Sequence, residues 1–250
     1  MLNNLGIPQL AYDYRAEHVP MFDAEVEALN RHHINLFAWW FPTVLNEEAR
    51  QILAVIQKHG VTPQLWVTGG GEAPRDAAGQ MAKIREEAVR IRTIAEPAAK
   101  LNCVVALYNH GGWFGEPENQ LAVLVELKLP NVGLVYNLHH GHAHLDRFPK
   151  LLKEMRPHLY AVNLNGMVPE GDRQGRKILP LGAGSLDVTL LKTIRDSGYR
   201  GPIGILGHTD DDAEDRLRDN LDGLAWLVPQ LAGKPPGEKP KYRTPVPPAP

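Results

Sequence analysis

Short apolar runs alternate with longer amphipathic segments along most of this chain. Eight runs have the length and the β-branched or aromatic content of buried strands, and each stops at a glycine, a proline or a polar side chain. The segments between them carry apolar side chains at the three- and four-residue spacing of a helix face. The apolar runs lie at residues 6–12, 34–41, 63–68, 104–107, 132–136, 159–164, 178–181 and 202–206.

This alternation predicts an α/β fold with a parallel sheet, and eight repeats predict closure into a single (β/α)8 TIM barrel. An open, doubly wound sheet is the alternative, and it needs a glycine-rich phosphate turn after an early strand. The glycines at 69–71 are the only candidate for that turn, and we interpret them as a flexible loop. The barrel is expected to occupy residues 1–232. The proline-rich residues 233–250 lack apolar periodicity and are expected to be extended or disordered.

Composition narrows the functional classes. The 250 residues carry a net charge of −2, which gives no support to binding of nucleic acid or of a membrane surface. The one cysteine, Cys103, excludes an internal disulfide and lies in an apolar stretch, so we expect a buried thiol. No apolar run is long enough to span a membrane, and the N-terminus lacks a signal-peptide pattern. A cytoplasmic location follows by default, although a chain trimmed of its signal would look the same.

Polar side chains gather where the predicted strands end. Five of the eleven histidines follow the fourth and fifth predicted strands. In parallel α/β folds the carboxyl ends of the strands carry the working residues. His59 and His144 are instead expected to be solvated helix residues. The candidate functional side chains at the strand ends are Tyr108, His110, Asn137, His139, His140, Asn163, Asn165 and His208.

Four stretches in this region carry a family pattern: LYNHGG, VGLVYNLHHGH, YAVNLNGM and ILPLGAGSLDVTLLKTIRDSGYRGPIGIL. They resemble the xylose isomerase-like TIM barrel superfamily, which includes sugar-phosphate isomerases and epimerases and endonuclease IV. The most specific part is GAGSLD followed by SGYRGPIGI, and the resemblance extends from about residue 23 to about residue 227. It implies the TIM-barrel fold and chemistry on a sugar.

The resemblance also implies a Mg²⁺ or Mn²⁺ site built from carboxylates at the strand ends. Where the family places a glutamate after the fourth strand and an aspartate after the fifth, this chain has Tyr108 and Asn137. His140 matches the family histidine, whereas Asn163 and Leu206 stand at the other two ligand positions. The chain is therefore expected to be a divergent member that lacks the usual metal-ligand carboxylates.

Strand parity suggests a relocated metal site. If Tyr108 faces the barrel interior, so does His110, which lies two residues further along the chain. In the same way, a histidine of the 139–140 pair and His208 are expected to face inward after their own strands. His110, His139 and His208 together would suit Zn²⁺ or another divalent ion such as Mn²⁺. The alternatives are that the histidines hydrogen-bond ligand hydroxyls or each other, or that their roles are structural. Adjacent histidines on an extended chain point to opposite sides, so at most two of the HHGHAH run are expected at the mouth.

Tryptophans flank the same strand ends. Trp39 and Trp40 close the second predicted strand, Trp66 lies on the third, and Trp113 follows the fourth. Alternation turns one of Trp39 and Trp40 inward and the other toward the helices. Aromatic rings beside amides and imidazoles suit the apolar face and the hydroxyl edge of a sugar. Because lysines and arginines are scarce at the strand ends, a non-phosphorylated sugar or polyol is favoured over a sugar phosphate.

The favoured interpretation is a sugar isomerase or epimerase, or a related lyase, that moves a proton next to a carbonyl. His140 and His110 are the candidate base and acid, because imidazole titrates near neutral pH. Glu116 is the only nearby carboxylate offered as an alternative base. Substrate contacts are expected from Tyr108, Asn137, Asn163, Asn165, Trp39, Trp66, Trp113 and Glu116.

Two rival functions follow from the same pattern. A sugar-binding barrel without catalysis fits the missing metal carboxylates. A nuclease resembling endonuclease IV is disfavoured by the near-neutral charge and by the same missing carboxylates. The expected partner is a small carbohydrate rather than nucleic acid or membrane, and a homo-oligomer is left open.

Overall fold

The computed structural model describes residues 1–248, so the last two residues of the predicted tail, 249–250, lie outside the described part of the chain. The fold is α/β, as predicted, with a parallel sheet whose seven strands follow chain order from β1 to β7. The described residues form two compact units, residues 1–135 and the residues from Tyr136 onward.

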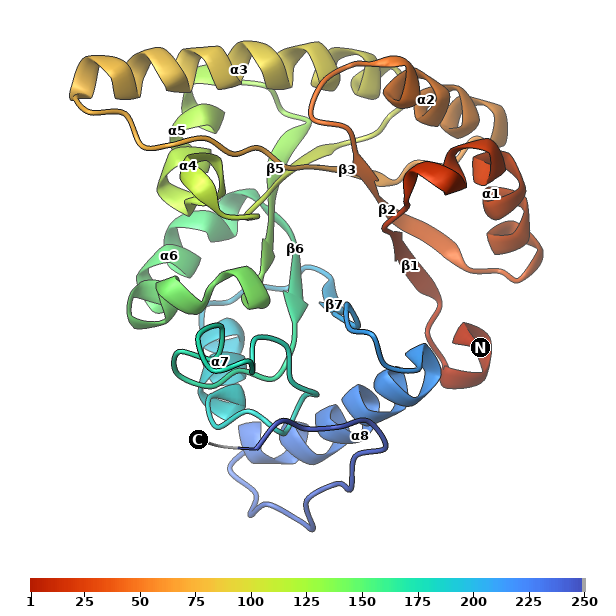
Figure 1. Ribbon diagram of the computed structural model, residues 1–250, viewed down its shortest axis with the longest axis vertical. Helices are drawn as coiled ribbons and strands as arrows, with labels where there is room; N and C mark the ends of the chain where they lie inside the picture. The colour runs from red at the N-terminus through yellow and green to blue at the C-terminus, as the bar shows by residue number, and fades with distance from the viewer. Residues whose placement is uncertain (249–250) are drawn as a thin grey trace. The chain divides into compact units, whose positions relative to one another are not determined.

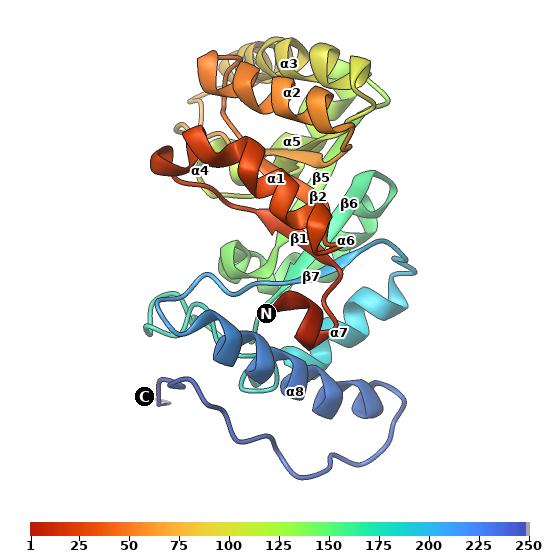
Figure 2. The ribbon, with the colours of Figure 1, turned by 90° about the vertical axis from the view of Figure 1, so that its right-hand side faces the viewer.

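The first unit is built from parallel strands covered by helices. Its strands pair in chain order, with Trp40 opposite Trp66 and Leu65 opposite Val105. The helices α1, α2, α3 and α5 lie outside these strands (Figures 1 and 2). The elements are β1 (Gln9–Tyr12), α1 (Phe22–Arg31), β2 (Asn35–Phe41), α2 (Glu47–His59), β3 (Gln64–Val67), α3 (Ala77–Lys100), β4 (Val105–Tyr108), α4 (Gly112–Gly115), α5 (Pro117–Leu127) and the start of β5 (Val132–Asn137).

Local sequence explains where these helices begin and end. The side chain of Asn46 accepts a hydrogen bond of 2.9 Å from the backbone N–H of Ala49 and so caps α2, a position that asparagine favours. Gly60 ends α2 in the left-handed conformation at φ 63°. Cys103 is buried, which confirms the predicted buried thiol, and burial raises its pKa to about 11.

The second unit alternates short helices with two further strands. Its elements after β5 are the 3-10 turns η3 (Leu138–His140) and η4 (His142–Arg147), then α6 (Phe148–Met155), β6 (Leu159–Leu164), α7 (Asp187–Asp196), β7 (Ile203–Ile205) and α8 (Ala213–Leu231). The strand predicted at residues 178–181 is wrong: only an isolated antiparallel bridge joins Leu179 to Gly166. Pro180 has no N–H to extend that ladder. The predicted eighth strand is therefore β7.

The aspartate of the GAGSLD motif holds the loop that replaces the missing strand. Asp187 is buried, and its carboxylate accepts backbone N–H bonds from Met167 at 2.7 Å, Gly182 at 2.7 Å and Gly184 at 3.1 Å. Burial raises the pKa of Asp187 to about 7, and the three donors act in the opposite direction. Asp187, in the most specific part of the family pattern, thus stabilises the loop by binding its backbone N–H groups; we call this arrangement the Asp187 clip.

The proline-rich tail has no helix or strand between residues 233 and 248, yet it runs back along α8 (Figures 1 and 2). The indole N–H of Trp226 donates to the carbonyl of Gly237 at 3.0 Å. The Tyr242 hydroxyl donates to the carbonyl of Leu181 at 3.1 Å. These contacts attach the described tail residues to the second unit.

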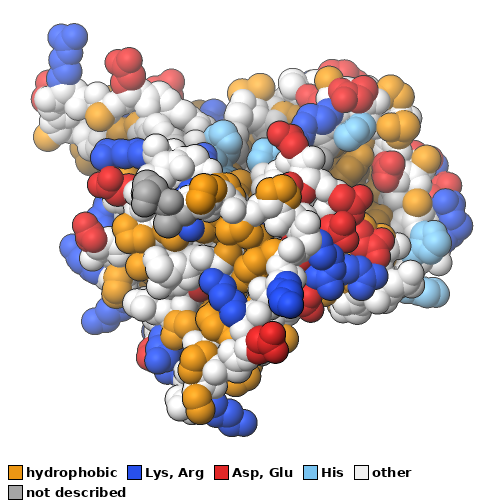
Figure 3. Space-filling view, turned by 60° about the horizontal axis from the view of Figure 1, so that its bottom comes forward, with side chains coloured by type: hydrophobic (Ala, Val, Ile, Leu, Met, Phe, Trp, Pro, Cys, Tyr) orange, Lys and Arg blue, Asp and Glu red, His pale blue; other side chains and the backbone are white. Residues whose placement is uncertain are grey.

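Charged side chains of both signs are visible on the face drawn in Figure 3. Lysine and arginine side chains are dispersed there among acidic ones. None of the described helices combines the length and the apolar character needed to cross a membrane.

Candidate functional site

Four side chains of the first unit form what we call the strand-end aromatic cluster: Trp40, Trp66, Tyr108 and His110. The register of β2 and β3 places Trp40 directly opposite Trp66, and their ring centroids are 4.6 Å apart. Trp66 lies opposite Ala106 of β4, and Tyr108 lies two residues further along the same face. Its ring centroid is 5.5 Å from Trp40 and 5.8 Å from His110.

One side of the cluster is buried in the protein and the other is accessible to solvent. Trp66 and Tyr108 are only 1% and 2% exposed, whereas Trp40 is half-buried and His110 is exposed. Burial raises the pKa of the Tyr108 phenol, and the nearby negative charge of Asp13 raises it further. Tyr108 therefore keeps its hydroxyl proton and can donate a hydrogen bond.

Trp39, which sequence reasoning named as a substrate contact, is not part of this cluster. Its ring is fully buried and packs on Phe22 of α1, with ring centroids 5.0 Å apart, and on Tyr12, 5.5 Å away. Alternation along β2 turns Trp39 toward the helix layer and its neighbour Trp40 toward Trp66. Trp40, and not Trp39, thus lies beside Trp66 and Tyr108 at the strand ends.

Trp113 is also held by packing and hydrogen bonds. Its side chain is buried, and its indole N–H donates to the Gln80 side-chain oxygen at 2.7 Å. Gln80 in turn donates to Asn119, which donates to the backbone carbonyl of Trp113 at 2.7 Å. This closed ring of hydrogen bonds anchors the loop after β4. Glu116 is the N-cap residue of α5 and is half-buried.

A further carboxylate, Asp13, was missed as a candidate. It follows β1 directly, its charge acts on Tyr108, and it forms an ion pair of 2.9 Å with Arg15. The signal that would have found it is its position at a strand end, the same rule that selected the histidines. Asp13 therefore joins Glu116 as a carboxylate to be considered as a base.

The second unit carries its own polar group at the end of β5. Asn137 is the last residue of the strand and is buried. His139 and His140 follow in the 3-10 turn η3, where their ring centroids lie 3.7 Å apart. The expectation that adjacent histidines point to opposite sides is wrong here, because it assumed an extended chain and the backbone turns instead.

Two more histidines of the run are structural. His144, expected to be solvated, is only 3% exposed, and its Nδ1 lies 3.0 Å from the Tyr136 hydroxyl. The Nε2 of His142 lies 3.0 Å from the carbonyl oxygen of Lys177, which makes it the donor. Burial of an imidazole against a specific partner cannot be inferred from a histidine count.

The remaining candidates lie around β6 and β7. Asn163 is buried opposite Gly204, where any larger side chain would collide with the Asn163 amide oxygen. The buried amide N–H₂ of Asn165 donates to the carbonyl oxygens of Gly166 at 2.9 Å and Lys177 at 3.1 Å, while its side-chain oxygen has no hydrogen-bond partner. A buried acceptor without a partner of this kind is uncommon in folded proteins. His208 is exposed in the loop after β7, and Leu206 also lies there.

The strand-end residues do not fit the carboxylate metal site that the family resemblance implied. At the ends of β4 and β5 the chain presents the neutral phenol of Tyr108 and the amide of Asn137. Neither supplies the anionic oxygen that Mg²⁺ or Mn²⁺ prefers. The alternative histidine site takes His110 from the first unit and His139 and His208 from the second, and it stays a prediction.

Comparison with known proteins identifies the family. The sequence pattern of the xylose isomerase-like TIM barrel family matches residues 33–229, whereas no curated protein matches the sequence. Similar solved structures include the probable 3-DHS dehydratase AsbF from Bacillus anthracis, with 15% identity over 90% of both chains and a TM-score of 0.69. The 3-keto-D-glucoside 4-epimerase YcjR from E. coli has 18% identity over 91% of both chains and a TM-score of 0.64.

A third similar structure is the IOLI protein, solved with a zinc atom, with 16% identity over 92% of this chain and 91% of that one and a TM-score of 0.69. At such identities these structures show a shared fold and not a shared activity. Together with the family match they confirm the TIM-barrel prediction. The chain belongs to the xylose isomerase-like TIM barrel family.

Proposed function

We propose that this chain is a carbohydrate-processing barrel that moves a proton next to a sugar carbonyl. The observation that carries the proposal is the strand-end aromatic cluster, in which the half-buried Trp40 and the exposed His110 flank the Tyr108 phenol. Solved structures of the same fold include a 3-keto-D-glucoside 4-epimerase, a D-tagatose 3-epimerase-like protein and an L-ribulose 3-epimerase. The two epimerases among them invert a carbon of a sugar, which favours this class of substrate.

Each member of the cluster has a role in the proposal. The exposed part of the Trp40 ring receives the apolar face of a sugar ring, and the Tyr108 hydroxyl donates to a sugar oxygen. His110 acts as acid or base, because an imidazole exchanges protons near neutral pH. Asp13 and Glu116 are the alternative bases in the first unit.

The second unit has its own candidates for proton transfer. His140 is the proposed partner base, and its neighbour His139 contacts its ring. Asn137, Asn163 and Asn165 are proposed to orient hydroxyl groups of the substrate; Asn165 brings a buried side-chain oxygen without a partner. Because the carboxylate metal site does not fit, no step of this proposal uses a metal. Zinc bound by His110, His139 and His208 remains a separate hypothesis.

A sugar-binding barrel without catalysis is the second candidate function. It is favoured by the neutral side chains of Tyr108 and Asn137 at two strand ends where the family resemblance implies carboxylates. The two functions differ in one measurable property. A catalyst exchanges the hydrogen next to the sugar carbonyl with solvent, and a binder does not.

The test combines binding with hydrogen exchange. A panel of non-phosphorylated ketoses and aldoses is screened by thermal shift, and each ligand is then incubated with the protein in D₂O and followed by proton NMR. Trp40→Leu should weaken binding roughly fivefold, which corresponds to about 1 kcal/mol for an aromatic contact. His110→Gln should retain binding and slow exchange by about 10² or more. His158→Gln, at an exposed histidine outside both groups, is the control.

Each outcome decides between the candidates. Exchange that depends on His110 supports the catalytic proposal. Binding that depends on Trp40, without exchange in the wild type, supports the sugar-binding barrel instead. If no sugar of the panel binds, or if Trp40→Leu binds as tightly as the wild type, the carbohydrate proposal is wrong.

A further inference from the structure

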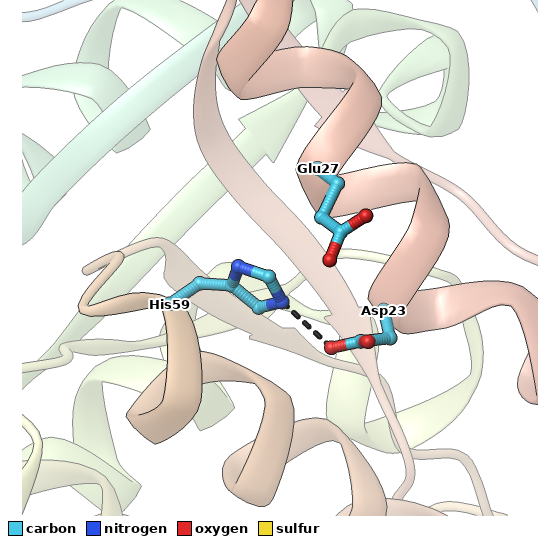
Figure 4. A group of neighbouring side chains, drawn as sticks. All are labelled: Asp23, Glu27 and His59. Atoms are coloured by element: carbon cyan, nitrogen blue, oxygen red, sulfur yellow. Dashed lines mark hydrogen bonds and ion pairs between the residues drawn. The ribbon is translucent and has the colours of Figure 1, made fainter.

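Three side chains on the helices of the first unit converge away from the strand-end aromatic cluster. Asp23 and Glu27 come from α1, and His59 is the last residue of α2. One ligand atom of each lies within 4.8 Å of the other two, and Figure 4 shows the three side chains pointing toward one another. We propose that Asp23, Glu27 and His59 bind one Zn²⁺ ion that links α1 to α2.

The fold prepares this arrangement. Asp23 and Glu27 are four residues apart, so they lie on one face of α1. Gly60 ends α2 directly after His59 and leaves the imidazole beside α1. His59 was expected to be solvated, but its side chain is only 11% exposed, so packing fixes the ring in place. A ring held in this way loses little rotational freedom on binding a metal.

The distance between His59 and Asp23 requires only a small adjustment. The Nε2 of His59 lies 2.7 Å from a carboxylate oxygen of Asp23. Zinc bonds of about 2.0–2.2 Å to nitrogen and oxygen at a tetrahedral angle place two ligand atoms roughly 3.4 Å apart. The two groups therefore need to separate by less than about 1 Å for an ion to enter between them. One imidazole and two carboxylates form a donor set that zinc accepts, with a fourth position left for water.

The cations that now occupy this group are weak competitors. The Lys58 ammonium lies 2.6 Å from the second carboxylate oxygen of Asp23, and Arg31 lies 3.9 Å from Glu27. The side chains of Lys58 and Arg31 are 60% and 66% exposed, and exposed ion pairs of this kind contribute little. A divalent ion coordinated by three ligands should displace them. Zinc would then stabilise the folded protein, because the unfolded chain does not hold the two helices together.

The site can be tested by zinc titration of the full-length protein against a chromophoric chelator, with Zn²⁺ alone as the probe. His59→Ala and Glu27→Gln should each remove one equivalent of bound zinc, or weaken its Kd at least tenfold. Lys58→Met should retain that equivalent and tighten it by a factor of up to about five, because a competing charge is removed. Glu25→Gln on the same helix and the exposed His158→Ala are matched controls and should bind as the wild type does.

The melting temperature, measured with and without zinc, distinguishes loss of the site from unfolding of a variant. Zinc should raise the melting temperature of the wild type and of Glu25→Gln but not of Glu27→Gln, a surface change that leaves the apolar core intact. Comparing equivalents between variants separates this site from any zinc held by His110, His139 or His208. If His59→Ala and Glu27→Gln bind as many zinc ions as the wild type with unchanged Kd, the proposal is wrong.

Discussion

The carboxylate of Asp219 on α8 is the main polar anchor of the C-terminal tail, and Asp219→Ala should release that tail. Asp219 is fully buried. It accepts bonds from the backbone N–H of Arg243 at 2.9 Å and of Thr244 at 2.8 Å, and from the Thr244 hydroxyl at 2.7 Å. The Arg243 guanidinium adds an ion pair of 3.0 Å. One side chain thus satisfies four donors of two consecutive tail residues.

The size of the effect follows from which donors are left buried. Thr244 is 6% exposed, so its N–H and its hydroxyl would lose their acceptor without gaining water. Each orphaned donor costs about 1–3 kcal/mol. Arg243 is 41% exposed on its side chain and rehydrates. The loss in free energy of unfolding is limited, because the tail can detach and its donors then bind water. We therefore expect a loss of about 2–4 kcal/mol, which corresponds to a fall in Tm of about 5–10 °C.

Limited trypsin digestion is the direct assay. Lys234 and Lys239 precede prolines and resist cleavage, whereas the bonds after Lys241 and Arg243 are cleavable once the tail is free. In Asp219→Ala these two bonds should be cut at least tenfold faster than in the wild type, since about 2–4 kcal/mol shifts the opening equilibrium by more than that factor. Mass spectrometry should show loss of residues 242–250 and 244–250 with the remainder intact.

Asp222→Asn is the matched control. Asp222 binds the same arginine at 2.8 Å, but its side chain is 48% exposed. An exposed pair is worth less than about 1 kcal/mol, so cleavage and Tm should stay close to those of the wild type. The reasoning fails if Asp219→Ala is cut no faster than Asp222→Asn, because the buried carboxylate would then not be what holds the tail.

Three further outcomes follow from the same structure. Burial raises the pKa of Asp219, but the donors from Arg243 and Thr244 lower it more, so the net pKa lies below its ordinary value. Its contribution to stability is therefore present above about pH 4 and lost as the pH falls further, and Trp226 fluorescence should report acid release of the tail that Asp219→Asn lacks. Gly223→Ala should destabilise the protein by about 1–2 kcal/mol in urea unfolding, because the new methyl group would overlap the carbonyl oxygen of Leu181. This clash outweighs the gain of about 1 kcal/mol in helix propensity. Gly237→Ala, with open space around it, is the control and should be neutral. Asp187→Asn should cost about 2–4 kcal/mol in the same assay, because the amide nitrogen would face backbone donors; a change below 1 kcal/mol would contradict the Asp187 clip.

Local patterns in the sequence were enough to place most elements and to select the strand ends. The alternation of apolar runs with amphipathic segments gave the α/β order, because strand and helix periods are properties of neighbouring residues. The Asn46 cap and the Gly60 stop of α2 are local for the same reason. Tyr108 and Asn137 close β4 and β5 as predicted, since the apolar run itself ends there.

Features that depend on residues far apart in the chain required the tertiary structure. Alternation establishes that Trp39 and Trp40 face opposite ways, but only the packing of Phe22 on Trp39 decides which one turns toward the helices. The run at residues 178–181 looks like a strand and forms a single bridge, because Pro180 has no N–H to extend it and Asp187 binds the backbone of the loop that follows.

The clearest contrast is between the histidines and the tail. A histidine is equally plausible as a ligand, a base or a solvated residue until its neighbours are known, and His59 became a candidate zinc ligand only when α1 brought Asp23 to 2.7 Å. The tail lacks any apolar period, yet Asp219 attaches it through donors more than twenty residues away. Sequence determined the order of elements and the chemistry available at their ends, because both are local; tertiary structure decided which groups meet, because contacts between distant residues depend on how the whole core packs.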